Sequence, residues 1–215
     1  MERLATGSWG SDPHSSSGDA TGTYRRPAIQ HFDEVREVND VDLQEVLALL
    51  ARAPKPPEAP LPTGANPGQI ASLERNLGHP IPAGLRRWLS VCNGYMAGPG
   101  GLYGAEVDRA SLDINQASWP EWRALGWIPI AGDGNGNAYV VPALPQKDDE
   151  PVYFVDCAGD PSSLAYIVAS SIPQFLTFLL RRDMGEPGWP FDRDYVLDRD
   201  PLIADVDADR LPWAG

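Results

Sequence analysis

Apolar side chains recur every three or four positions in several parts of the chain, which is the spacing of an amphipathic helix. In "NPGQIASLERNLG", residues 66–78, Ile70, Leu73 and Leu77 fall on one face of such a helix. An asparagine N-cap opens this stretch, a glutamine closes a capping box, and a glycine ends the helix. "IPAGLRRWLSVCNG", residues 81–94, repeats the pattern after a short "HPIP" step. These two segments predict a helical hairpin.

Two further helices are predicted, one before and one after the central part of the chain. "NDVDLQEVLALLAR", residues 39–52, places leucines and a valine on one face, and a proline-rich stretch follows it. "SSIPQFLTFLLRR", residues 170–182, has Ser171 as its N-cap and Gln174 in the position that closes a capping box. Its apolar residues also share one face, so we expect this helix to pack on the core.

Short apolar runs bounded by Gly, Pro, Asn or Asp lie between the helices, which is typical of antiparallel strands. They cover residues 102–107, 127–131, 137–141, 152–156 and 165–169. Helices first, strands in the middle and a helix last predict an α+β fold. We expect a single domain in which the N-terminal helices pack on a twisted, mainly antiparallel sheet with a C-terminal helix.

Changes in composition divide the chain into four parts. Residues 1–28 are rich in Ser and Gly and poor in large apolar groups, so a disordered tail is expected. Residues 29–65 hold the first helix and the proline-rich linker, and residues 66–182 hold the compact domain. Residues 183–215 form an acidic extension with several aromatic residues, and we expect much of it to pack on the domain.

The formal net charge of −13 argues against nucleic acid or an anionic membrane as a partner, because both are negatively charged. Residues 131–160 carry six acids and one lysine, so the acidic side of the central domain lies in its loop-rich half. No apolar run approaches the roughly 18 residues that span a bilayer, and residues 1–22 lack the apolar stretch of a signal peptide. We therefore expect a cytoplasmic protein with reduced cysteines.

The stretch "IPIAGDGNGNAYVV" is the strongest candidate for chemistry in the sequence. Its glycines do not form a dinucleotide fingerprint, because a strand and not a helix follows them. Asp133, Asn135 and Asn137 match the first ligand positions of a calcium loop, but the sequence lacks the bidentate glutamate that should end such a loop. The preferred interpretation is a hairpin turn in which Gly134 and Gly136 take positive φ, with no metal or cofactor.

The chain offers little catalytic chemistry. His14, His31 and His79 fall in the tail, before the compact domain and in a Gly-His-Pro turn, and no serine lies in a nucleophile elbow. We therefore expect no enzymatic activity. Trp119, Trp122 and Trp127 crowd the segment "WPEWRALGW". We interpret them as core packing, with an exposed anchor for a partner protein as the alternative.

Four segments, in this order, resemble the SUKH superfamily of bacterial immunity proteins and fungal cell-wall regulators. "IASLERNLGHPIPAGLRRWLSVCNG" is similar to the family's opening helices, which close with Asn93-Gly94 here. "IPIAGDGNGNAYVV" is similar to its central hairpin, "PVYFVD" to the next strand, and "IVASSIPQFLTFLL" to its terminal strand and helix. The resemblance covers roughly residues 66–182. It implies protein binding without catalysis: bacterial members neutralise toxins, and fungal members act as regulatory adaptors.

We therefore expect a cytosolic immunity protein that binds and neutralises a toxin, with nucleases among the candidates, by covering the toxin's site. The alternative is a regulatory adaptor of the fungal type. In the first case the partner is a basic toxin domain whose association acidic residues steer. The sequence leaves the partner's identity and the oligomeric state open. The candidate partner-binding residues are Asp133, Asn135, Asp148, Asp149, Glu150, Asp156 and Asp160, and the expected structural motif residues are Asn93, Gly94, Gly134, Gly136 and Asn137.

Overall fold

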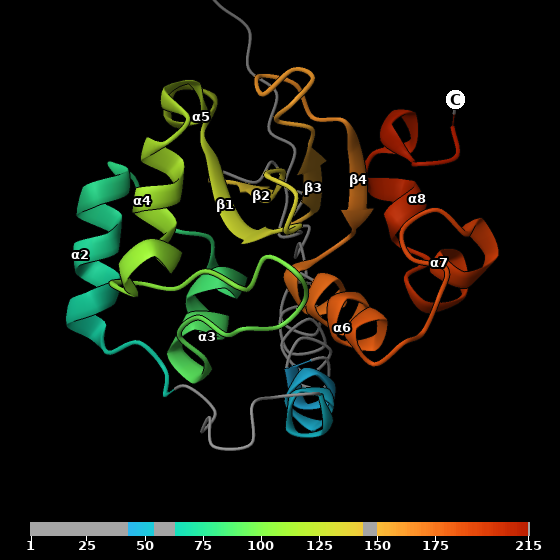
Figure 1. The fold of residues 1–215 in the computed structure, drawn as a ribbon, viewed down its shortest axis with the longest axis horizontal. Helices are drawn as coiled ribbons and strands as arrows, with labels where there is room; N and C mark the ends of the chain where they lie inside the picture. The colour runs from blue at the N-terminus through green and yellow to red at the C-terminus, as the bar shows by residue number, and fades with distance from the viewer. Residues whose placement is uncertain (1–42, 54–62, 144–149, 215) are drawn as a thin grey trace, which may run out of the picture.

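A computed structural model describes residues 43–53, 63–143 and 150–214. These residues form the predicted α+β fold, in which helices surround a four-stranded sheet (Figure 1). Residues 43–52 form the first described helix. The later elements are α2 (Pro67–Leu77), α3 (Ala83–Val91), η1 (Asp108–Ala110), α4 (Leu112–Ala117), α5 (Pro120–Leu125), β1 (Trp127–Gly132), β2 (Ala138–Pro142), β3 (Val152–Val155), β4 (Tyr166–Ala169), α6 (Ile172–Asp183), α7 (Arg193–Arg199), α8 (Ile203–Val206) and η2 (Ala208–Arg210).

The sheet runs in the order β1-β2-β3-β4, and every neighbouring pair is antiparallel, as the sequence predicts. A register shift between Pro129 and Ala131 interrupts the regular pairing of β1 with β2. All residues of β1 are buried, as are most residues of the other strands. Figure 1 shows α2, α4 and α5 beyond the β1 edge, and α7 and α8 beyond the β4 edge. The helices therefore enclose the sheet from several sides.

The first helical hairpin follows the sequence prediction. Asn66 and Gln69 form the expected capping box: Asn66 Oδ1 accepts a hydrogen bond from the Gln69 amide at 3.0 Å, and Gln69 Oε1 accepts one from the Asn66 amide at 2.9 Å. Gly78 ends α2 with a φ of +84°. α3 then buries Leu85 and Trp88 in the core that also receives the apolar face of α2.

The predicted strand at residues 102–107 is wrong. Leu102 makes isolated bridges to the preceding loop and to β1, and the chain then continues into η1. Gly104 lies within this segment, and Gly98, Gly100 and Gly101 come just before it. Glycine weakens a strand because it offers no side chain to pack. Asn93 holds the segment in place: its side chain donates to the Ala105 carbonyl at 2.9 Å and accepts from the Ala105 amide at 2.6 Å. Gly94, with a φ of +77°, turns the chain after α3.

α4 and α5 lead from η1 to β1 and have no counterpart among the predicted helices. Each contains six residues, and such short helices show too few apolar positions for a periodicity to be recognised. Pro120 stands in the first turn of α5, and Gly126 ends that helix in the left-handed conformation. Both helices lie against β1, where they shape the candidate site.

The C-terminal extension packs on the domain. Trp189 belongs to the same buried core as the sheet, and its indole N–H donates to the Val168 carbonyl at 2.8 Å. Ser171 caps α6 as predicted, but Gln174 does not complete the capping box. The Gln174 side chain instead donates to the Arg199 carbonyl at 2.9 Å. The end of α7 is therefore attached to the first turn of α6.

A buried carboxylate strengthens this attachment. Asp200 follows α7 and is 1% exposed. Its two oxygens accept hydrogen bonds from the Ser170 amide at 2.7 Å and from the Ser170 hydroxyl at 2.5 Å. We call the contacts made by Trp189, Arg199 and Asp200 the C-terminal latch, because together they connect the extension to β4 and α6.

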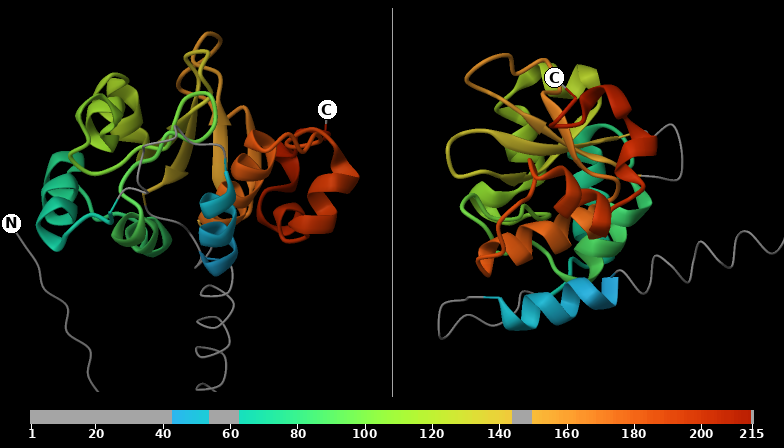
Figure 2. Two further views of the ribbon diagram at one scale, coloured as in Figure 1. Left: turned by 60° about the horizontal axis from the view of Figure 1, so that its bottom comes forward. Right: turned by 90° about the vertical axis from the view of Figure 1, so that its right-hand side faces the viewer.

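The helix of residues 43–52 also packs on the domain, beside α6 (Figure 2). Val46 and Leu50 are buried in the core, and Glu45 forms an ion pair with Arg181 of α6 at 2.9 Å. None of the helices in the described ranges is long and apolar enough to cross a bilayer. The predicted disordered tail and residues 54–62 of the proline-rich linker lie outside the described residues.

Candidate functional site

The glycine-rich loop is a tight turn that joins β1 to β2. Asp133 organises it: one carboxylate oxygen accepts hydrogen bonds from the amides of Asn135 at 2.7 Å and Asn137 at 3.0 Å, and the other accepts one from the Asn137 side chain at 2.8 Å. Gly134 and Gly136 have φ values of +82° and +97°, in the left-handed region that favours glycine. Asn135 is exposed within this turn. Asp133 therefore stabilises the turn through contacts within its own loop.

The Asp133 carboxylate stays ionised in this turn. Burial raises its pKa, but the hydrogen bonds from Asn135 and Asn137 outweigh burial, so the pKa lies below the ordinary value of 3.8. The Asn137 side chain also accepts a hydrogen bond from the Cys157 amide at 3.0 Å. This bond ties the turn to the loop that follows β3.

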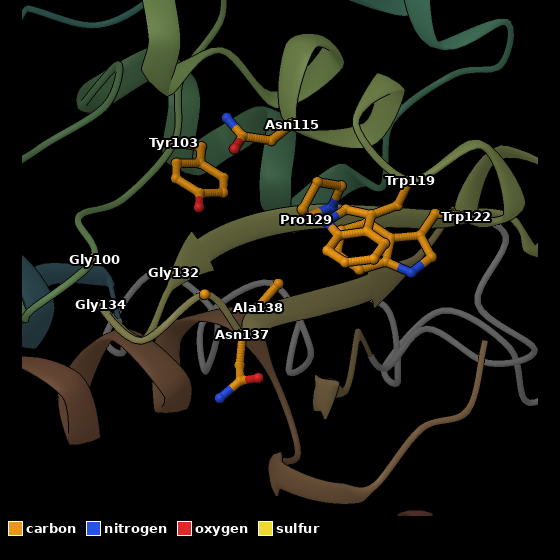
Figure 3. Close-up of a pocket in the computed structure, with 11 residues that line it drawn as sticks. Gly100, Tyr103, Asn115, Trp119, Trp122, Pro129, Gly132, Gly134, Asn137 and Ala138 are labelled. Atoms are coloured by element: carbon orange, nitrogen blue, oxygen red, sulfur yellow. The ribbon is translucent and has the colours of Figure 1, made fainter. Parts of the chain in front are cut away.

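A pocket of about 320 Å³ opens beside the turn (Figure 3). Figure 3 shows Tyr103 and Asn115 towards one end and Trp119 and Trp122 towards the other, over the strand that carries Pro129. Glycines of the turn and of neighbouring segments supply much of the remaining wall. Aromatic rings, a side-chain amide and uncovered backbone therefore line the same pocket.

Two stacked indoles form one end of the pocket. The rings of Trp119 and Trp122 lie with their centroids 5.5 Å apart and their planes at 24°. Trp122 is 1% exposed, and its indole N–H donates to the Pro161 carbonyl at 2.7 Å. Trp119 is half-buried and lines the pocket. Core packing therefore describes Trp122, whereas Trp119 also presents ring surface to the pocket.

The opposite end carries two polar oxygen atoms without a hydrogen-bond partner among the described residues. The Asn115 side-chain nitrogen donates to the carbonyls of Arg109 at 3.0 Å and Ser111 at 2.8 Å, which sets the orientation of the amide. Within the described residues, no group donates to the Asn115 side-chain oxygen, Oδ1, or bonds to the Tyr103 hydroxyl. Burial raises the pKa of Tyr103, so its hydroxyl keeps its proton at neutral pH. Both groups are available to a ligand.

Carboxylates gather beside the pocket. Burial raises the pKa of the Cys157 thiol to about 11, and the charges of Asp133, Asp156 and Glu121 add to this increase. Asp160 follows in the same loop as Asp156, and both are exposed. Among the residues that the structure describes, none of the four acids forms an ion pair. We call Asp133, Asp156, Asp160 and Glu121 the acidic rim.

The remaining predicted acids do not join this rim in the described structure. Glu150 accepts hydrogen bonds from two amides at the N-terminus of α3, at 2.6 and 3.1 Å. Burial raises its pKa despite these bonds. Its carboxylate therefore stabilises α3, a contact between residues far apart in the sequence. Asp148 and Asp149 lie outside the described residues.

The loop between Tyr103 and Asn115 holds an unfavourable backbone conformation. Glu106 and Asp108 have φ values of +56° and +44°, where residues other than glycine lose about 1–3 kcal/mol each. Backbone strain of this kind clusters at binding sites and switch regions, because surrounding contacts must hold it in place. Here the two hydrogen bonds between Asn93 and Ala105, the residue before Glu106, help to fix the loop.

Three residues of the site are not singled out by the sequence. Tyr103 lies in the segment interpreted as a strand, and Asn115 lies in a helix too short to be recognised. Glu121 offers the one usable signal, because it stands between the two tryptophans of "WPEW". His79 lies away from the pocket, with its Nδ1 at 3.1 Å from the Pro80 carbonyl oxygen. In the described part of the chain, no three His, Cys, Asp or Glu side chains are grouped to hold a metal ion.

Comparison with models of known protein families gave a match. The family model described as "SMI1 / KNR4 family (SUKH-1)" matches residues 64–177, which include the helical hairpin, the pocket and the whole sheet. A comparison with curated protein sequences gave no significant match.

Proposed function

The chain belongs to the SMI1/KNR4 family (SUKH-1), and on this premise we propose that it is a cytosolic immunity protein that binds a toxin and covers its site. Membership of this family fits a non-catalytic binding role. The observation that carries the proposal is the acidic rim, whose four carboxylates have no ion-pair partner among the described residues. Negative charge of this kind suits a basic protein partner.

The acidic rim and the pocket have complementary tasks in this proposal. Exposed carboxylates attract a basic domain over a distance of about 10 Å at moderate salt, and they therefore raise the association rate. The aromatic pocket offers a buried contact of the type that dominates binding free energy. The neutralised toxin then loses access to its substrate because the complex covers its site.

A kinetic experiment tests the electrostatic part of the proposal. The full chain is used to capture partners from its native host, and proteins encoded next to it are tested first. We expect the association rate with the partner to fall about tenfold or more between low and high salt. In the double variant Asp156→Asn with Asp160→Asn, we expect a fall of about threefold at low salt. Asparagine keeps the side-chain oxygens that accept loop amides at 3.1 and 3.0 Å, so the loop is preserved.

The matched control removes the same amount of charge elsewhere. Asp194 of α7 and Asp205 of α8 are exposed, and the double variant Asp194→Asn with Asp205→Asn should leave the association rate nearly unchanged. Equal effects of the two double variants, or a rate indifferent to salt, would remove the role of the rim. Growth of cells that express the partner decides the biological role. Rescue by the chain supports immunity, and a harmless partner supports the regulatory adaptor.

A further inference from the structure

We infer that the pocket receives an arginine side chain of the partner, which lies along the Trp119 indole and donates hydrogen bonds at the opposite, Tyr103–Asn115 end. The inference rests on the proposed function, because it names the contact through which a basic protein partner is recognised. Four properties of the pocket lead to it: size, aromatic surface, unpaired acceptors and surrounding charge.

The size of the pocket suits a single long side chain. Its volume of about 320 Å³ lies at the lower end of the range of about 300–1,000 Å³ that is typical of ligand pockets. A helix or a base pair needs more room than this. An extended side chain entering from a partner's surface fits, because the pocket opens beside an exposed turn.

The aromatic surface suits a planar cation. Arginine stacks on tryptophan and tyrosine faces more often than lysine does. The chain already uses this contact twice: the Arg199 guanidinium lies 4.0 Å from the centroid of the Tyr195 ring, and that of Arg182 lies 5.8 Å from the Trp189 ring. Trp119 has no such cation over it among the described residues. Its ring surface in the pocket is available to an arginine from outside.

The unpaired groups at the other end act as acceptors. A guanidinium carries five N–H donors and no acceptor, so it matches the Asn115 side-chain oxygen and the Tyr103 hydroxyl oxygen. An aliphatic or aromatic side chain would cover both oxygens without a hydrogen bond, which is unfavourable. The Asn115 amide is already oriented by its two donated bonds, at 3.0 and 2.8 Å, so little freedom is lost when it accepts another.

The charge around the pocket selects a cation over an anion. Asp133 lies between two pocket glycines in the chain, and Glu121 lies between the two tryptophans. A phosphate or carboxylate ligand would be repelled by these acids, whereas a guanidinium is attracted. Arg109 belongs to the same loop as Tyr103, but it is exposed and does not line the pocket. The chain's own nearby arginine therefore leaves the pocket open.

Short peptides test the inference without the partner. The probes are acetyl-Gly-Gly-Xaa-Gly-Gly-amide peptides in which Xaa is arginine, lysine or citrulline, the neutral isostere of arginine. The readout is the indole N–H resonance of Trp119 in a proton–nitrogen correlation spectrum of the full chain, assigned with Trp119→Phe. We expect a saturable shift with the arginine peptide in the millimolar range, about fivefold weaker binding of lysine, and no saturable shift with citrulline.

Variants connect the shift to the pocket. Tyr103→Phe removes one hydroxyl and keeps the ring, and we expect it to weaken the arginine peptide about threefold, as followed at the Trp119 resonance. Trp119→Ala should abolish binding, as followed by calorimetry, with the far-ultraviolet circular dichroism spectrum as the check of folding. Phe191→Ala is the matched control, because this aromatic residue is 61% exposed and does not line the pocket. It should leave peptide binding unchanged.

Each result decides the inference separately from the proposed function. Equal shifts with arginine and citrulline peptides, or no shift with arginine at 20-fold the expected dissociation constant, would overturn the inference. A partner that binds Trp119→Ala as tightly as the parent chain would overturn it too, while leaving the immunity proposal intact. If the arginine peptide binds but no protein partner depends on the acidic rim, the proposed function fails and the cation site remains.

Discussion

Asp200 offers the sharpest test of how the C-terminal extension is held. We consider its replacement by alanine, which removes a carboxylate that is 1% exposed. In the parent chain the Ser170 amide and hydroxyl donate to the Asp200 oxygens at 2.7 and 2.5 Å, and the replacement removes both acceptors. Ser170 is itself 5% exposed, so water reaches these donors poorly. The perturbation therefore leaves buried polar groups without partners.

The magnitude follows from two opposing contributions. A hydrogen bond to a charged group contributes about 1.5–3 kcal/mol, so the loss of two such bonds destabilises the fold by about 3–6 kcal/mol. Removal of the carboxylate also removes the unfavourable burial of its charge, which offsets part of this loss. We therefore expect Asp200→Ala to lower the free energy of unfolding by about 2–4 kcal/mol, out of a typical total of about 5–15 kcal/mol.

Urea denaturation followed by circular dichroism measures this change. The midpoint should fall while the slope of the transition stays constant, as for a loss of stability without a change in the surface exposed. Asp200→Asn keeps one acceptor and should cost about half as much. Asp194→Ala, at an exposed position of α7, should change stability by less than about 0.5 kcal/mol.

A small effect would refute this reasoning. If Asp200→Ala changed stability by less than about 1 kcal/mol, hydrogen bonding to Ser170 would not hold the extension. A lower slope would point to detachment of the extension before the rest of the domain unfolds. Tryptic cleavage in the extension reports on this directly, and it should accelerate in Asp200→Ala and remain slow in Asp194→Ala.

The turn beside the pocket yields two further predictions. Gly134→Ala and Gly136→Ala both place a side chain at positive φ, but the new Cβ of the first would lie 2.8 Å from Pro99 and that of the second would meet nothing within 4 Å. Thermal unfolding should therefore show a cost of about 1–2 kcal/mol for Gly136→Ala and a larger one for Gly134→Ala, and equal costs would contradict the steric argument. Because the folded pKa of Asp133 is below 3.8, its hydrogen bonds stabilise the protein above that pH and are lost as the pH falls through the folded pKa. Asp133→Asn should lower stability at pH 7 and flatten its fall below about pH 4, and an unchanged acid profile would exclude this role.

Local patterns in the sequence predict the parts of the fold that depend on neighbours along the chain. Asn66 and Gln69 stand three residues apart, so their capping box can be predicted from the order of residues alone. The turn at Gly134 and Gly136 can be predicted for the same reason, because the conformation depends on local backbone sterics. Gln174 shows the limit of such patterns. It occupies the right position for a capping box, but its side chain donates a hydrogen bond to the Arg199 carbonyl of α7 instead.

The candidate site depends on contacts that no local pattern encodes. Tyr103 comes from a loop, Asn115 from α4 and Trp119 from the residue before α5, and the folded chain brings them to one pocket beside β1. Glu150 also depends on distant contacts, but there they remove a residue from the predicted site. It belongs to an acidic run in the sequence, yet it binds amides of α3 that are 65 and 66 residues away. An acidic composition predicts that the protein has an acidic surface. Burial and hydrogen bonds to distant residues then determine which acids are exposed on that surface.

The C-terminal latch extends the folded unit beyond the segment that matches the family. The family match ends at residue 177, inside α6, whereas Trp189 and Asp200 lie beyond it and are buried against β4 and the start of α6. The range that matches the family model is thus shorter than the range that packs into one core in this chain. In this chain the extension covers the β4 flank of the domain, whereas the pocket lies beside β1, at the other edge of the sheet.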